Sequence, residues 1–256
     1  MINETNTKDP IIRQYTLMIG SIFSESWHKV KGVKGTFIGS YLILILFELL
    51  IIGAGAIINY ALLGSSDNLV NIVMNVYTII MFLVMLPLVG GLILLGIYRA
   101  ASRPIQIKML FTDYERRFYR LSLLYLLLVA FYAITFFIIF FIAGLIATLT
   151  SIDPVLITIT LTTVLMVASM AYFVMSLPLL LDRKNMGIIQ SIKLSCKAVH
   201  HHFFKILAII ISCIFITFLS AIPFGIGLIW SIPWTTTAYG ILYRELFNVE
   251  LMPQSD

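Results

Sequence analysis

Long apolar runs without a formal charge alternate along the chain with shorter segments that hold most of the charge. The clearest runs cover residues 68–98, 121–152, 154–181 and 206–243. A helix needs about 20 apolar residues to cross a hydrocarbon core of about 30 Å. The runs lack the alternation of apolar and polar positions that marks the strands of a membrane barrel. The pattern therefore predicts membrane-spanning α-helices.

The last run is too long for one span. At 1.5 Å per residue it would extend about 57 Å as a single helix, nearly twice the thickness of the core. Pro223, Gly225 and Gly227 interrupt it. We therefore expect an all-α, polytopic membrane helical bundle of six transmembrane helices, arranged as three hairpins, with spans at about 37–62, 70–98, 121–149, 155–181, 206–222 and 226–243.

The distribution of Lys and Arg predicts the orientation of these spans. Basic residues precede the first span, fill the links after the second and fourth spans, and follow the sixth span, whereas the other three links contain none. Because cytoplasmic loops carry the excess of Lys and Arg, we expect both termini in the cytoplasm. Residues 1–36 then form a cytoplasmic segment, 37–248 the transmembrane domain and 249–256 a cytoplasmic tail. Four spans plus a re-entrant hairpin at 206–243 would fit the charges equally well.

Amphipathic patterns predict helices in the cytoplasmic interface at 107–120, 188–204 and, less regularly, 15–30. Their polar faces are basic, and clustered Lys and Arg beside a span attract anionic lipid. We therefore regard the following as candidates for binding anionic lipid or a protein partner: Lys108, Arg116, Arg117, Arg120, Lys193, Lys197 and Lys205.

Glu48 is the one formal charge inside a predicted span, near its middle. An ionised acid in the membrane core costs several kcal/mol. Glu48 therefore either forms a proton or cation site that faces the bundle interior, or is protonated and hydrogen-bonded to a neighbour such as Tyr77 or Thr236.

Four prolines in or beside the predicted spans are candidate helix kinks: Pro87, Pro178, Pro223 and Pro233. Broken helices are a weak indication of transport. The tryptophans predict interfacial anchoring, with Trp27 near the cytoplasmic interface and Trp230 and Trp234 in the outer half of the last span.

Composition and motifs argue against catalysis. The chain is 60% hydrophobic and only 11% charged, with a mean hydropathy of +1.02, whereas soluble domains are about 25% charged. No G-x-S-x-G, H-E-x-x-H or phosphate-binding glycine loop occurs. Adjacent positions of a helix diverge, so His200, His201 and His202 cannot converge on one metal ion, and Cys196 and Cys213 are not expected to pair. We expect no enzyme activity, cofactor, metal or nucleic-acid partner.

The chain also shows a weak internal repeat. Gly96-Ile97-Tyr98-Arg99 resembles the ending Gly240-Ile241-Leu242-Tyr243-Arg244. The implied unit is an interfacial helix followed by two spans, present three times.

Two stretches in the last third of the chain carry a family resemblance. They are Ser176-Leu177-Pro178-Leu179-Leu180-Leu181-Asp182 with Met186-Gly187 and the region of Ser191 and Ser195, and the tail from Ile222-Pro223-Phe224-Gly225 through Pro233 to Tyr243-Arg244. Over residues 170–248 the chain resembles the YciC-like group of bacterial multi-pass inner-membrane proteins. The resemblance implies an inner-membrane location and supplies no catalytic residue.

The expected function is that of a non-enzymatic inner-membrane component that contacts anionic lipid of the cytoplasmic leaflet, or a protein partner, through its basic cytoplasmic helices. The alternative is a small-solute or ion transporter or channel that uses Glu48 and the kinked second and sixth helices.

Overall fold

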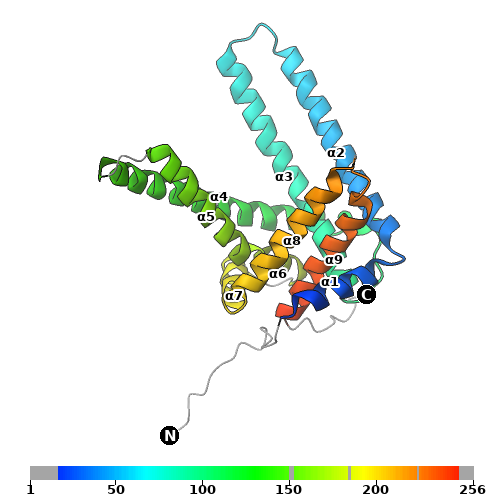
Figure 1. Ribbon diagram of the computed structural model, residues 1–256. Coiled ribbons are helices and arrows are strands. Elements are labelled where there is room, and N and C mark those ends of the chain that lie inside the picture. The colour runs from blue at the N-terminus through cyan, green and yellow to red at the C-terminus, as the bar shows by residue number, and fades with distance from the viewer. Residues whose placement is uncertain (1–16, 150–152, 184–185, 224, 248–256) are drawn as a thin grey trace. The chain divides into compact units, whose positions relative to one another are not determined.

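The regular elements of the protein are helical (Figure 1), which confirms the all-α class. The computed structural model describes residues 17–149, 153–183, 186–223 and 225–247, so the predicted tail 249–256 and the start of the N-terminal segment lie outside the described residues. In chain order the elements are α1 (Ile19–Val30), α2 (Lys34–Ala61), α3 (Asp67–Ala100), the 3-10 helix η1 (Ile107–Leu110), α4 (Tyr114–Leu149), α5 (Pro154–Phe173), α6 (Ser176–Asp182), α7 (Ile188–His200), α8 (Phe203–Ala221) and α9 (Leu228–Leu246).

Five segments of the described chain are long and apolar enough to cross a membrane, as expected for a multi-pass protein. The sixth predicted span corresponds to α9, which is not one of them. The five segments are Lys34–Ala61, Asp67–Ala100, Tyr114–Thr148, Pro154–Asp182 and Phe203–Ala221.

Of the four proline positions, Pro178 and Pro223 lie where the helices are interrupted. Pro178 has no N–H to donate to the carbonyl of Val174, four residues earlier, and α5 gives way to α6 at Val174 and Met175. Pro223 lies in the turn between α8 and α9. In contrast, α3 continues through Pro87 and α9 through Pro233.

The predicted interfacial helix at 107–120 is wrong. Residues 107–110 form only the short η1, and a new helix begins at Tyr114 and continues into the membrane span as α4. The backbone reverses at Asp113, whose φ of 52° is incompatible with a continuous right-handed helix. The other two interfacial predictions correspond to α1 and α7.

The chain divides into two compact units. The first contains the described parts of 1–119 and 213–256, and the second contains residues 120–212. In the first unit, α2, α3 and η1 enclose an apolar core that includes Phe37, Leu95 and Leu110. In the second unit, α7 packs against α5 and α6.

Helices α3 and α9 make the closest helix crossing in the first unit. A Cβ added to Gly240 would lie 2.2 Å from the carbonyl oxygen of Gly96, and a Cβ added to Gly96 would lie 2.4 Å from that of Thr236. The two glycines therefore allow backbone-to-backbone contact, as small residues do between membrane helices. They are the first residues of the two similar motifs, so the repeated sequence marks the contact.

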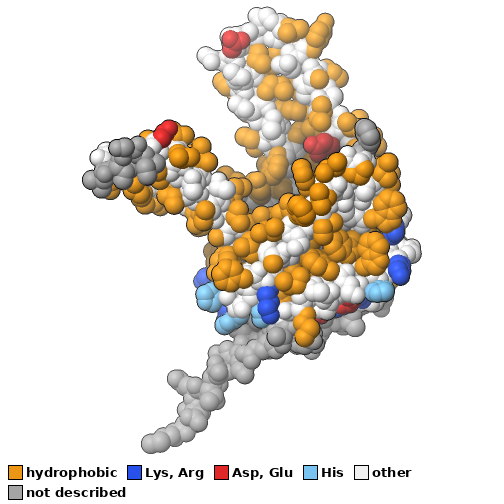
Figure 2. Space-filling view, in the orientation of Figure 1, with side chains coloured by type: hydrophobic (Ala, Val, Ile, Leu, Met, Phe, Trp, Pro, Cys, Tyr) orange, Lys and Arg blue, Asp and Glu red, His pale blue; other side chains and the backbone are white. Residues whose placement is uncertain are grey.

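The α2–α3 hairpin exposes most of its apolar surface (Figure 2), including Leu50, Ile57 and Ile79. Apolar surface this extensive is not found on soluble monomers. Its exposure agrees with helices that face lipid.

Candidate functional site

Arg117 does not face lipid or a partner, contrary to the sequence-based expectation. Its side chain is 4% exposed. It donates from Nη1 to the carbonyl of Pro87 at 3.1 Å, and from Nη2 to those of Met109 at 3.2 Å and Leu110 at 3.1 Å. Arg117 therefore joins the start of α4 to α3 and η1, and its charge serves buried carbonyls rather than phosphates.

The surroundings of Arg117 explain how α3 accommodates Pro87. Tyr114 donates its hydroxyl to the carbonyl of Val84 at 2.6 Å, close to the point where the proline ring disrupts the helical ladder. Gly91 leaves space for the guanidinium, because a Cβ there would lie 2.8 Å from Nη1 of Arg117. The proline and the glycine were visible in the sequence, but their partner was not.

Arg120 also has a structural role. It is half-buried and donates to the carbonyls of Arg183 and Met186 within the second unit. Its guanidinium ties the start of α4 to the segment that follows α6. Arg120 is therefore a weaker candidate for lipid binding than the sequence suggested.

The remaining basic candidates are more accessible. Lys108 is exposed on η1, Arg116 is half-buried on α4, and Lys205 is exposed on α8. Lys193 and Lys197 lie on the exposed face of α7, opposite a buried face formed by Ser191, Leu194, Ser195, Ala198 and Val199.

Glu48 is exposed on α2, and the two suggested neighbours make other hydrogen bonds. Tyr77 donates its hydroxyl to the carbonyl of Ile51. Thr236 donates to the carbonyl of Ile232 at 2.8 Å and lies 3.4 Å from the hydroxyl of Tyr41. The hydroxyls that the sequence offered as partners for Glu48 therefore both donate to backbone carbonyls.

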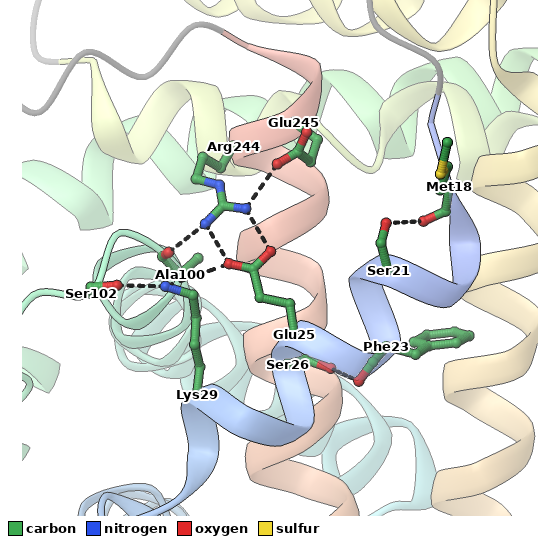
Figure 3. A network of polar contacts seen from close by, with 10 residues as sticks. All are labelled: Met18, Ser21, Phe23, Glu25, Ser26, Lys29, Ala100, Ser102, Arg244 and Glu245. Atoms are coloured by element: carbon green, nitrogen blue, oxygen red, sulfur yellow. Dashed lines mark hydrogen bonds and ion pairs between the residues drawn. The ribbon is translucent and has the colours of Figure 1, made fainter.

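An ionic network holds α1 against the ends of α3 and α9 (Figure 3). Arg244 donates to both carboxylate oxygens of Glu25, at 2.8 and 2.7 Å, and to the carbonyl of Ala100 at 2.9 Å. The hydrogen bond from Arg244 lowers the pKa of Glu25 below its usual value, against an opposing effect of burial, and the charges of Arg244 and Lys29 lower it further. Arg99 ends the motif Gly96-Ile97-Tyr98-Arg99, as Arg244 ends the similar motif that begins at Gly240. Arg99 also contacts α1, because it donates to the carbonyl of Lys29.

All three tryptophans of the chain line one groove of about 420 Å³ in the first unit. Trp27 comes from α1, and Trp230 and Trp234 come from α9, where Trp234 donates its indole N–H to the carbonyl of Phe23 at 3.0 Å. The sequence had placed Trp27 and the other two tryptophans near opposite membrane interfaces. The prediction was wrong because hydropathy does not reveal that α9 packs against α1.

Potential metal ligands do not cluster in the described parts of the chain. No group of three or more His, Cys, Asp or Glu side chains there could hold a metal ion. Cys196 and Cys213 are both free.

No family model, no curated protein and no solved structure matches this chain.

Proposed function

We propose that the protein is a non-catalytic, multi-pass component of a bacterial inner membrane that binds anionic phospholipid of the cytoplasmic leaflet. The amphipathic α7 is the observation that carries this proposal. One face of α7 is buried in the second unit, and the opposite face presents Lys193 and Lys197. The resemblance of residues 170–248 to YciC-like proteins favours the same location.

We further propose that α8 and α9 form a re-entrant hairpin beside four full spans. Trp230, near the start of α9, lies beside Lys34 at the start of α2, with the ammonium 5.7 Å from the ring centroid. Arg244, near the end of α9, contacts Ala100 at the end of α3. Because α2 and α3 form a hairpin, these two points belong to the same side of the bilayer. A helix that crossed the membrane would have its ends on opposite sides, as the six-span alternative requires.

Neutralising the α7 lysines tests the lipid-binding proposal. We expect Lys193→Gln with Lys197→Gln to weaken binding of phosphatidylglycerol to the purified protein by about fivefold per lysine, because each basic residue near an anionic surface contributes about 1 kcal/mol. Native mass spectrometry with a lipid titration measures the change.

The matched control is Lys193→Arg with Lys197→Arg, which keeps both charges and should keep binding. Unchanged binding of the glutamine variant would exclude α7 as the lipid-binding surface.

A transporter remains the second candidate because Glu48 lies exposed within a helix long and apolar enough to span the membrane. A carboxylate in that position costs several kcal/mol unless it serves a site or is protonated. Transport predicts that Glu48→Gln abolishes ion or proton flux into liposomes that hold the protein. Flux that is absent from the wild-type protein, or unaffected by the substitution, would leave lipid binding as the better explanation.

A further inference from the structure

The tryptophan-lined groove carries a specific site that the basic helices do not explain. Its walls are aromatic and apolar, and Phe23, Ile216 and Ser220 complete them beside the tryptophans. Its volume of about 420 Å³ lies within the range of about 300–1,000 Å³ that is typical of small-molecule sites. The groove can therefore hold part of an amphiphile, such as an acyl chain.

The ammonium group of Lys34 lies beside two of the tryptophans that line this groove. The ammonium of Lys34 lies 5.8 Å from the ring centroid of Trp27 and 5.7 Å from that of Trp230. Cation–π contact at these distances fixes the ammonium beside the groove. An ammonium has three N–H donors, and two ring faces leave at least one for an anion. Lys31, exposed in the turn before α2, is a second lysine three residues away along the chain.

An unsatisfied hydroxyl lies in the wall of the groove. Ser231 is 5% exposed, and its buried Oγ has no hydrogen-bond partner. Neighbouring hydroxyls on α9 do have partners: Thr236 and Thr237 each donate to a carbonyl of the preceding turn at 2.8 Å. A buried hydroxyl without a partner costs about 1–3 kcal/mol. The protein encloses this Oγ, so Ser231 adds a polar position to the wall of the groove without exposing its hydroxyl to it.

We propose that this groove binds one anionic phospholipid, with its phosphate at Lys34 and an acyl chain against the tryptophans. Aromatic cages also bind quaternary ammonium groups. Here, however, Lys34 already occupies the faces of Trp27 and Trp230, so a choline group would meet a like charge. Charge complementarity therefore favours an anionic headgroup.

This inference deepens the proposed function, because it names a second and specific site for the same class of lipid. It depends on different residues from those on α7. Variants of the two sites can therefore fail independently, which separates the two proposals.

Because all three tryptophans line the groove, tryptophan fluorescence can report lipid binding there directly. Phosphatidylglycerol with brominated acyl chains, titrated into the purified full-length protein in detergent, should quench the tryptophan fluorescence saturably. Brominated phosphatidylcholine should quench more weakly at equal concentration. Lys34→Met should weaken the phosphatidylglycerol affinity by about fivefold, the loss expected for one basic contact.

Three controls accompany this titration. Lys34→Arg keeps the charge and should retain binding, whereas Lys31→Met removes one charge away from the rings and should have the smaller effect. The α7 double variant should leave the quenching unchanged. An unaltered emission maximum and elution volume would show that each variant is folded.

The proposal is overturned if the two lipids quench equally, if phosphatidylcholine quenches more strongly, or if folded Lys34→Met binds like the wild-type protein. Quenching that is absent because a second copy covers the groove would also overturn it, and size-exclusion chromatography would detect that dimer.

Discussion

At the scale of single residues, basic side chains of this protein differ in what they contact. Arg117 is buried and bonded to three carbonyls, whereas Lys193 is exposed on α7. A guanidinium offers five donors in a fixed plane, so it can serve several carbonyls at once, which an ammonium does less well. The structural role of Arg117 follows from this geometry, because the carbonyls near Pro87 and at the end of η1 lie within its reach.

Arg117→Leu should lower the stability of the protein by about 2–3 kcal/mol, because it removes the charged donor from buried carbonyls. Thermal unfolding in detergent measures the loss. Lys108→Gln, which removes a charge from an exposed side chain near η1, is the control and should leave the unfolding midpoint unchanged. Equal midpoints for the Arg117 variant and the wild-type protein would contradict the structural role.

At the scale of elements, the contact between α3 and α9 depends on two glycines. Gly96 and Gly240 allow the two backbones to touch, and each begins a motif that ends in an arginine bound to α1. The motifs therefore combine a close helix crossing with an anchor for the interfacial helix. Hydrogen bonds and van der Waals contacts, rather than the hydrophobic effect, hold such helices together in lipid.

Gly240→Ala should destabilise the protein by about 1–3 kcal/mol, because the added methyl group would overlap the carbonyl of Gly96. Gly53→Ala is the matched control, since a Cβ there meets nothing within 4 Å. That control should be unchanged or more stable by about 0.5–1 kcal/mol. The thermal unfolding midpoints of both variants measure these changes in stability. Equal midpoints for Gly240→Ala and Gly53→Ala would argue against the close crossing of α3 and α9.

The attachment of α1 should depend on pH. Because the folded-state pKa of Glu25 is lowered, its contribution to stability is present above the unfolded value of about 4.3 and is lost as the pH falls below it. We expect the thermal unfolding midpoint to decrease as the pH is lowered through this range. The decrease should be less steep for the Glu25→Gln variant. Glu115→Gln neutralises an exposed carboxylate outside the network and should keep the wild-type slope.

At the scale of the whole molecule, the main question is how many times the chain crosses the membrane. From the positions of the basic residues, we expect both termini in the cytoplasm with either six spans or four. The contacts of α9 with Lys34 and Ala100 favour four spans with a re-entrant hairpin. The two arrangements differ in the location of the turn between α8 and α9.

Cysteine labelling of that turn distinguishes them. In a Cys196→Ser, Cys213→Ser background, Ser65→Cys in the α2–α3 turn should react with an impermeant maleimide added outside spheroplasts. Ile222→Cys, exposed after α8, should not react from outside, and Lys193→Cys should react only from the cytoplasmic side. Labelling of Ile222→Cys from outside at the rate of Ser65→Cys would establish six spans.

The sequence by itself determined the all-α class with its long apolar helices and the existence of the amphipathic α1 and α7, and it predicts the side on which the cations lie. Each of these follows from the free energies of transferring side chains from water into the membrane, which add along a local segment. The order of the residues is therefore enough to predict them. The tertiary structure alone decided that Arg117 and Arg120 donate to backbone carbonyls. It also decided that Tyr77 and Thr236 do so, and that Trp27 shares a groove with Trp230 and Trp234. These tertiary contacts depend on which helices pack against each other. The closest helix contact is made by glycines, which contribute almost nothing to hydropathy and are therefore not marked in a hydropathy pattern.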